Sequence, residues 1–359
     1  MIADFATIGY KGDEAMKLAR MGRRMCALTG LAMWLGAAWM AAVAQPAHAL
    51  ELRIGNVQVD ESPVGRGSHK FAALVQEKSG GRIKVTVLNG GKAGSDTDMR
   101  EKLVKGELEI MAASATLFAS AAKEVALWDT PFLFASYAEA DAILDGMPGR
   151  KVLETLAPKG MIGLAYWENG FRNLTNSLRP VTKLEDLQNL RLRVQQSEVF
   201  INMFKAFGTQ VQPMPFPQVY GALQNKAIDA QENPLPVIVS AKLHEVQGYL
   251  TLTRHSYSPF LVAASRQWWD TLKPEDQKII RDAAYETRVS QRQDARQVAD
   301  AALAELQAKG MKVSELQVGE RARIERKLEQ VNTSIATKVG LPLFIETVSE
   351  LQKLRQTKK

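Results

Sequence analysis

The chain has 359 residues, of which 46 are Lys or Arg, 39 are Asp or Glu and one is Cys. A single cysteine excludes an intrachain disulfide framework and a cysteine-rich metal site. The small basic excess is spread along the chain, which favours a solvated surface and no binding to nucleic acid.

The first 49 residues have the pattern of an export signal. Basic residues at 17, 20, 23 and 24 precede an apolar run from Met25 to Val43, and Ala47-His48-Ala49 matches the small-x-small pattern of a cleavage site. We therefore predict that residues 1–49 are a cleaved signal peptide for export to the periplasm; an uncleaved membrane anchor is the alternative. Cleavage leaves 310 residues, enough for two domains, and removes the only cysteine, Cys26.

Strands and helices are predicted to alternate after Leu50. Residues 52–57 have the alternation of a strand, residues 68–78 have helical spacing, and Gly80-Gly81 is typical of a helix end. A second strand is predicted at 83–87, a second helix at 95–105 and a third strand at 108–112. This order predicts a mostly parallel sheet covered on both faces. The same order restarts near Lys183, so a second α/β domain is expected to begin close to Phe171.

The last quarter of the chain, from residue 274 onward, is predicted to be mainly helical. Residues 274–309 form one amphipathic pattern without internal Pro or Gly. A helix of that length spans roughly 50 Å at 1.5 Å per residue, so we expect it to pass across both domains. Two further amphipathic helices are predicted near 320–338 and 343–354.

A candidate anion site lies in the middle of the chain. A strand at 190–194 places Arg191 and Arg193 together on one face, pointing away from the core. Phe216 follows in a loop stiffened by prolines at 213, 215 and 217, the last of them in the first turn of a helix over 218–225. Arginines beside a rigid aromatic loop suit the capture of a small anion. Solvated or paired arginines and a core position for Phe216 are the alternatives.

Several motifs share their order with a known family: Gly80-Gly81-Arg82-Ile83-Lys84-Val85, Gly94-Ser95-Asp96, Pro131-Phe132-Leu133-Phe134, Glu168-Asn169-Gly170-Phe171-Arg172, Leu192-Arg193-Val194, Met214-Pro215-Phe216 with Val219-Tyr220, and Asp229-Ala230-Gln231-Glu232-Asn233-Pro234. With them the chain resembles the DctP-type solute-binding proteins of tripartite ATP-independent periplasmic (TRAP) transporters. The resemblance implies an α/β, two-domain periplasmic-binding-protein-like fold with a central cleft and a long hinge helix spanning both domains. Domain I is expected to hold residues 50–171 and 259–298, and domain II residues 172–258 and 299–359.

The resemblance also implies a set of ligand-binding residues. Arg193 matches the arginine that forms the main salt bridge to the ligand carboxylate, and Arg172 matches a second carboxylate contact. Phe216 matches the aromatic residue beside the ligand, and Asn233 a hydrogen-bonding side chain on the opposite wall. Asp96 and Ser114 fall where the first domain supplies polar contacts, and the matched motifs add Glu168 and Tyr220 to the candidate set.

The implied function is that of a periplasmic receptor that captures a small organic acid and delivers it to TRAP membrane permease subunits, with no cofactor or metal. Ser114 stands where sialic-acid-binding members carry a carboxylate, and Trp167 precedes Glu168-Asn169-Gly170. Together these residues favour a C4-dicarboxylate or a hydroxy or sugar acid.

Three further functions compete with this one. An enzyme needs a nucleophile, a base or a metal site, but the mature chain has no Cys and its three histidines, His69, His244 and His255, are far apart in sequence. Glu168 and Glu232 are a conceivable acid–base pair whose separation the sequence does not fix, so we predict that the protein is not an enzyme. The second competing function is that of a receptor for an ATP-driven importer, and the third is that of an extracytoplasmic ligand-sensing module. The long helix after Pro274 favours the TRAP class.

Overall fold

The computed structural model describes residues 50–357, so the predicted signal peptide lies outside the described residues. Within this range no helix has the length and apolar character that a membrane span requires. The strands are β1 (Leu50–Gly55), β2 (Ile83–Leu88), β3 (Ile110–Ser114), β4 (Met161–Asn176), β5 (Arg191–Val194), β6 (Gln210–Pro213), β7 (Ala230–Pro234), β8 (Tyr249–Ser265) and β9 (Lys312–Ser314). The α-helices are α2 (Pro63–Lys78), α3 (Asp96–Lys105), α4 (Tyr137–Asp145), α5 (Met147–Glu154), α6 (Glu198–Ala206), α7 (Val219–Gln224), α8 (Leu235–Ser240), α9 (Arg266–Trp269), α10 (Pro274–Ala308), α11 (Glu320–Lys327), α12 (Glu329–Val339) and α13 (Leu341–Gln356).

The nine strands of this range form one mixed sheet in the order β2-β1-β3-β8-β4-β7-β5-β6, with β9 paired to β8. The pairs β1–β2, β1–β3, β5–β6, β5–β7 and β8–β9 are parallel. The pairs β3–β8, β4–β8 and β4–β7 are antiparallel. The α/β alternation is therefore confirmed, and five of the eight strand pairs in this range are parallel. The antiparallel pairing of the two long central strands, β4 and β8, was not predicted.

The long strands β4 and β8 change partners along their length. β8 pairs with β3 through Phe260–Ala264, whereas β4 pairs with β7 through Arg172–Asn176. Along this course the β4–β8 register shifts at Gly163/Ala165, at Glu168/Gly170 and at Arg172/Leu174. Gly170 has φ +115°, a conformation that residues with a Cβ seldom adopt. The chain therefore passes through the predicted boundary at Phe171 on two continuous but irregular strands.

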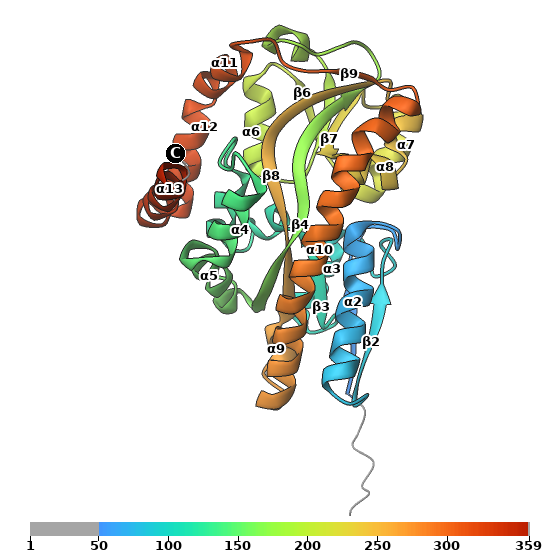
Figure 1. Cartoon of the computed structure of the whole chain (residues 1–359), viewed down its shortest axis with the longest axis vertical. Helices are drawn as coiled ribbons and strands as arrows, with labels where there is room; N and C mark the ends of the chain where they lie inside the picture. Colours follow the sequence, from blue (N-terminus) through green and yellow to red (C-terminus); the bar gives the residue numbers. More distant parts are fainter. Residues whose placement is uncertain (1–49, 358–359) are drawn as a thin grey trace, which may run out of the picture. The chain divides into compact units, whose positions relative to one another are not determined.

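The predicted long helix is confirmed as α10, which has 35 residues and lies along α2 and β4 (Figure 1). Its Ile280, Ala283 and Ala284 belong to a buried cluster with β1 and α2, whereas Leu306 belongs to another with α7 and α8. Gln291 fixes its middle to β4, because its amide accepts from the N–H of Glu168 (2.7 Å) and donates to the Glu168 carbonyl (2.8 Å).

The remaining predicted helices are partly confirmed. α3 begins and ends as expected, since Ser95 caps it through a hydrogen bond from Asp98 N–H and Gly106 ends it at φ +77°. The predicted helix at 320–338 is instead two helices, α11 and α12, separated at Leu328. Pro217 lies in a 3₁₀ turn, Phe216–Gln218, that leads into α7.

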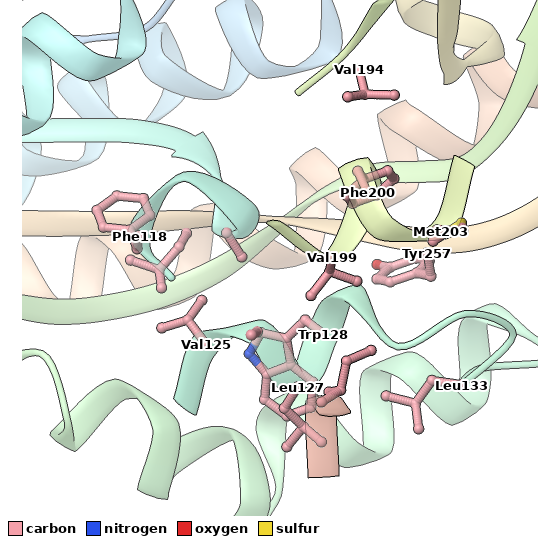
Figure 2. Close-up of a cluster of buried hydrophobic side chains, with 14 of the residues drawn as sticks. Phe118, Val125, Leu127, Trp128, Leu133, Val194, Val199, Phe200, Met203 and Tyr257 are labelled. Carbon is pink, nitrogen blue, oxygen red and sulfur yellow. The ribbon is translucent and has the colours of Figure 1, made fainter. Parts of the chain in front are cut away.

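The largest buried cluster joins elements that are far apart in sequence. Trp128 from the 3₁₀ turn Lys123–Asp129, Val199 and Phe200 from α6, and Tyr257 from β8 all belong to it (Figure 2). α12 also packs on that 3₁₀ turn and on α6, and α13 packs on α4 and α5. The C-terminal helices thus contact elements from both predicted domains.

Candidate ligand-binding site

A small cavity lies where α3, β3, β4, β5 and β7 meet. Its walls are formed by Val57, Gln58, Asp96, Ser114, Leu117, Asn169, Arg193, Gln195, Gln196, Met214, Pro215, Phe216, Asn233 and Phe260. Five of the eight predicted ligand-binding residues are among them: Asp96, Ser114, Arg193, Phe216 and Asn233. The other three, Arg172, Glu168 and Tyr220, do not line this cavity.

Arg193 is the only cationic side chain among the residues that line the cavity. It is 3 % exposed and does not belong to the apolar cluster that holds Leu190, Leu192 and Val194. The side chain thus leaves the apolar core as predicted, but it enters a buried cavity and is not solvated. Its Nε and Nη2 donate to the Met214 carbonyl at 3.0 and 2.8 Å, and its guanidinium lies 5.9 Å from the ring centroid of Phe216. Within residues 50–357 its Nη1 has no hydrogen-bond partner, which leaves one edge of the fork free for an anion.

Burial lowers the pKa of Arg193 to about 10, and the nearby positive charge of Arg172 acts in the same direction, whereas Glu232 and Asp96 oppose it. At neutral pH the guanidinium is still charged. A buried cation without a paired carboxylate favours an anionic ligand, because such a ligand supplies the missing counter-charge.

Arg191, the other arginine of the strand, lies in a different environment. It pairs with Asp229, with Nε to Oδ2 at 2.9 Å and Nη2 to Oδ1 at 2.5 Å, and its side chain is partly exposed. Its charge is therefore already neutralised within the protein.

Asp96 brings a negative charge to the same cavity. It is the first residue of α3 and is 8 % exposed, and it lines the same cavity as Arg193. Burial raises the pKa of Asp96 to about 7, against the opposing influence of Arg193. Its Oδ1 is buried without a hydrogen-bond partner among the described residues, and so is Nε2 of Gln195.

The other lining residues are mostly neutral hydrogen-bonding groups. Asn233 donates from Nδ2 to Gln231 Oε1 at 2.6 Å, and Ser114 shares a hydrogen bond of 3.2 Å with Ser258. Phe216, Leu117, Val57 and Phe260 supply apolar surface. The volume is about 30 Å³, whereas small-molecule pockets usually measure about 300–1,000 Å³. Entry of an organic acid therefore requires the surrounding elements to move apart.

Arg172 forms a buried ion pair instead of lining the cavity. Its Nε pairs with Glu232 Oε2, its Nη2 donates to Glu232 Oε1 at 2.9 Å, and His255 Nε2 lies 3.1 Å from Glu232 Oε2. Burial alone raises the pKa of the Glu232 carboxyl, but Arg172 and His255 outweigh it and hold that pKa below its usual value. The charge of Arg172 is thus neutralised inside the protein, and its proposed contact with the ligand stays a prediction.

Glu168 and Tyr220 lie elsewhere. Glu168 accepts from Arg296 Nη2 at 2.7 Å and from the Tyr257 hydroxyl at 3.0 Å, and it lines a separate cavity of about 240 Å³ between β4, α8 and α10. The Tyr220 hydroxyl donates to Glu245 at 2.7 Å on the surface. A ligand role for either residue stays a prediction.

Sequence reasoning missed four amide side chains that line the cavity: Gln58, Asn169, Gln195 and Gln196. The position of the two glutamines directly after β5 was a usable signal, because the residues that follow a strand lie at its carboxyl end, where α/β sheets bind ligands. Thr97 of α3 donates to Gln196 at 3.2 Å. No group of three or more His, Cys, Asp or Glu suited to a metal occurs in the part of the chain that the structure describes.

The long hinge helix, the crossing strands and a buried arginine in a polar cavity define a two-domain binding protein. Residues 54–338 match the family model DctP, described as bacterial extracellular solute-binding protein, family 7. The chain belongs to the DctP family, the solute-binding proteins of TRAP transporters.

Individual relatives agree with this assignment. The chain is 40 % identical over 223 residues to the 2,3-diketo-L-gulonate-binding periplasmic protein YiaO of Escherichia coli, covering 62 % of this chain and 68 % of that protein. It is 29 % identical over 301 residues to the C4-dicarboxylate-binding periplasmic protein DctP of Rhodobacter capsulatus, covering 83 % and 89 %. Among solved structures, the sugar acid binding protein DctPAm of Advenella mimigardefordensis in complex with galactonate superposes with a TM-score of 0.82 at 39 % identity, covering 84 % and 98 %.

These comparisons confirm the family and the two-domain fold. They also confirm that the protein is a solute-binding protein of a transport system and not an enzyme. The protein is a TRAP solute-binding receptor for organic acids. Receptors of this class work with membrane permease subunits, and the names of YiaO and of DctP from Rhodobacter capsulatus describe both as periplasmic proteins.

Proposed function

We propose that Arg193 binds the carboxylate of a small organic acid in the cavity described above, and that the loaded receptor delivers this acid to the TRAP permease. The observation that carries the proposal is the buried guanidinium of Arg193, whose Nη1 faces no acceptor within residues 50–357 while its other edge is fixed by the Met214 carbonyl. A planar fork held in this way meets both oxygens of a carboxylate.

The ligand classes that we propose are those predicted from the sequence, a C4-dicarboxylate or a hydroxy or sugar acid. The names of the relatives, which include a diketo-gulonate receptor, a C4-dicarboxylate receptor and a galactonate complex, support both classes. The neutral amides around Arg193 support an acid with further polar groups.

We also propose that residues 1–49 are removed on export to the periplasm, as the leader pattern and the periplasmic names of the relatives support. The domain boundaries at residues 171/172, 258/259 and 298/299 remain a proposal. The register shifts of β4 at Glu168/Gly170 and Arg172/Leu174 support the first boundary.

The carboxylate contact is tested by calorimetry on Arg193→Lys with an acid found in a thermal-shift screen of organic acids. Losing one partner of a buried, bidentate charge pair costs on the order of 3 kcal/mol, about a hundredfold in affinity. Lys restores little of this, because a point charge does not reproduce the fork.

Arg191→Lys is the matched control, since Arg191 is on the same strand but pairs with Asp229. We expect its affinity to stay close to that of the wild type. If the affinity of Arg193→Lys for the acid lies within a few-fold of the wild-type affinity, the carboxylate does not bind at Arg193 and the proposed site is wrong.

A further inference from the structure

We infer that the cavity selects an acid with one carboxylate and several hydroxyls, of the aldonic acid class, and that Asp96 accepts a hydrogen bond from a ligand hydroxyl. The inference rests on the proposed function, because Arg193 is assigned the single carboxylate. It goes further by excluding acids whose second carboxylate would lie beside Asp96.

Asp96 presents an unmatched acceptor to the cavity. Its side chain lines the cavity and is 8 % exposed, yet Oδ1 accepts no hydrogen bond within residues 50–357. A buried acceptor without a partner is costly, more so when it carries a charge. A ligand group that donates to Oδ1 therefore contributes to affinity directly.

Gln195 presents an unmatched donor to the same cavity. Gln195 is 6 % exposed, and its Nε2 has no acceptor among the described residues. A hydroxyl both donates and accepts, so a ligand with several hydroxyls satisfies an unpaired acceptor and an unpaired donor. A carboxylate accepts only, and a methylene group does neither.

The charges of the cavity wall suit a ligand with a single carboxylate. Asp96 and Arg193 are the two charged side chains among the residues that line the cavity, and the nearby Arg172 is neutralised by Glu232. One ligand carboxylate pairs with Arg193. A second carboxylate has no further cation in the cavity wall and is repelled by Asp96.

Protonation sets the conditions for the test. Burial raises the pKa of Asp96 to about 7, while Arg193, the charged group that faces it, acts in the opposite direction. Below this pH a neutral carboxyl can donate to a second carboxylate, so discrimination is measured at about pH 8.5, where Asp96 is ionised.

The experiment is calorimetry with acids that differ in one feature. D-Galactonate and galactarate carry the same four inner hydroxyls and differ at the terminal carbon, which is an alcohol in the first and a carboxylate in the second. Hexanoate has the same chain length without hydroxyls. D-Gluconate, D-erythronate and succinate extend the panel to other configurations and lengths.

We expect the tightest aldonate to bind at least tenfold more strongly than galactarate, succinate and hexanoate. Asp96→Asn should weaken that aldonate about tenfold or more and should narrow the gap to galactarate, because the repulsion is removed. Glu101→Gln is the matched control: it removes the same charge from an exposed position of α3 outside the cavity, and it should leave both affinities within twofold.

The result that overturns the inference is a dicarboxylate or hexanoate as the tightest ligand, or an Asp96→Asn variant that binds the aldonate within twofold of the wild type. If Arg193→Lys weakens every acid while Asp96→Asn changes none, the carboxylate site stands and the hydroxyl contact is wrong. Failure of all acids to bind the folded wild type would instead refute the carboxylate site itself.

Discussion

The buried ion pair between Arg172 and Glu232 leads to a prediction about stability. Arg172 is 1 % exposed and Glu232 0 %, and Nε and Nη2 of the arginine contact both carboxylate oxygens. Glu232→Gln keeps the shape but removes the charge, so Arg172 is left buried without a counter-ion. Breaking such a pair costs about 3–5 kcal/mol.

This cost converts to a change in melting temperature. For a chain of this size, 1 kcal/mol corresponds to about 2 °C, so Glu232→Gln should lower the Tm by about 6–10 °C. Differential scanning calorimetry at neutral pH without ligand is the assay. His255 adds to the loss, because its Nε2 also lies within hydrogen-bond distance of the Glu232 carboxylate.

Two variants separate the ion pair from unspecific damage. Arg191→Gln breaks the neighbouring but partly exposed pair with Asp229, and it should shift the Tm far less. The double variant Arg172→Met/Glu232→Leu removes both charges and should recover much of the stability. A Glu232→Gln protein that melts within about 2 °C of the wild type would refute the assignment of Arg172 to a structural pair.

Two further predictions concern motion and pH. Small-angle scattering should give a smaller radius of gyration when a tight-binding acid is added to the wild type, because the ligand supplies the counter-charge that the closed cavity needs. The same concentration of acid should not change the radius of gyration of Arg193→Lys. An unchanged radius of the wild type at saturation would count against a hinge motion. Burial raises the pKa of Asp129 to about 7, and Glu232 adds to the rise, although Thr116, Ser197 and Arg172 act against it. Ionising Asp129 in the folded protein therefore lowers the free energy of unfolding, by on the order of 4 kcal/mol at most. This loss of stability is absent near pH 4 and fully present above pH 7. Asp129→Asn should accordingly gain stability relative to the wild type between pH 4 and pH 8 in denaturant titrations, and a constant difference across this range would contradict the assignment.

Local pattern was enough to predict the elements whose sequence signals are strong. α3 has a capping serine and a terminating glycine, and α10 has a long amphipathic pattern without a breaker. The helix break at Leu328 has no Pro or Gly signal, because Glu320–Val339 contains neither residue, and the sequence pattern therefore predicted one helix. The antiparallel centre of the sheet was missed because the direction of pairing depends on contacts between residues far apart in sequence, such as Tyr166 with Leu261.

Prediction of the site from sequence was also limited by contacts between residues far apart in the chain. Alternation placed Arg191 and Arg193 on one face of β5 but did not distinguish them. Their difference comes from distant partners: Asp229 neutralises Arg191, whereas Arg193 meets the Met214 carbonyl. The resemblance supplied Asp96 and Asn233, but the partner of Arg172 is Glu232, across the β4–β7 pairing, and only the assembled sheet brings the two together.

The distribution of charge around the cavity links binding to closure. Asp96 and its helix α3 come from the first predicted domain, whereas Arg193 and Gln195 come from the second, and contacts such as Thr97 to Gln196 and Ser197 to Asp129 join the two sides. Bringing the sides together removes water from the cation Arg193, from the anion Asp96 with its unpaired Oδ1, and from the unpaired Nε2 of Gln195. Without a ligand these groups oppose closure, because their desolvation is not compensated. An acid that pairs with Arg193 and donates to Asp96 reverses this balance, so the groups that select the ligand are also those that make the closed state favourable only when it is bound.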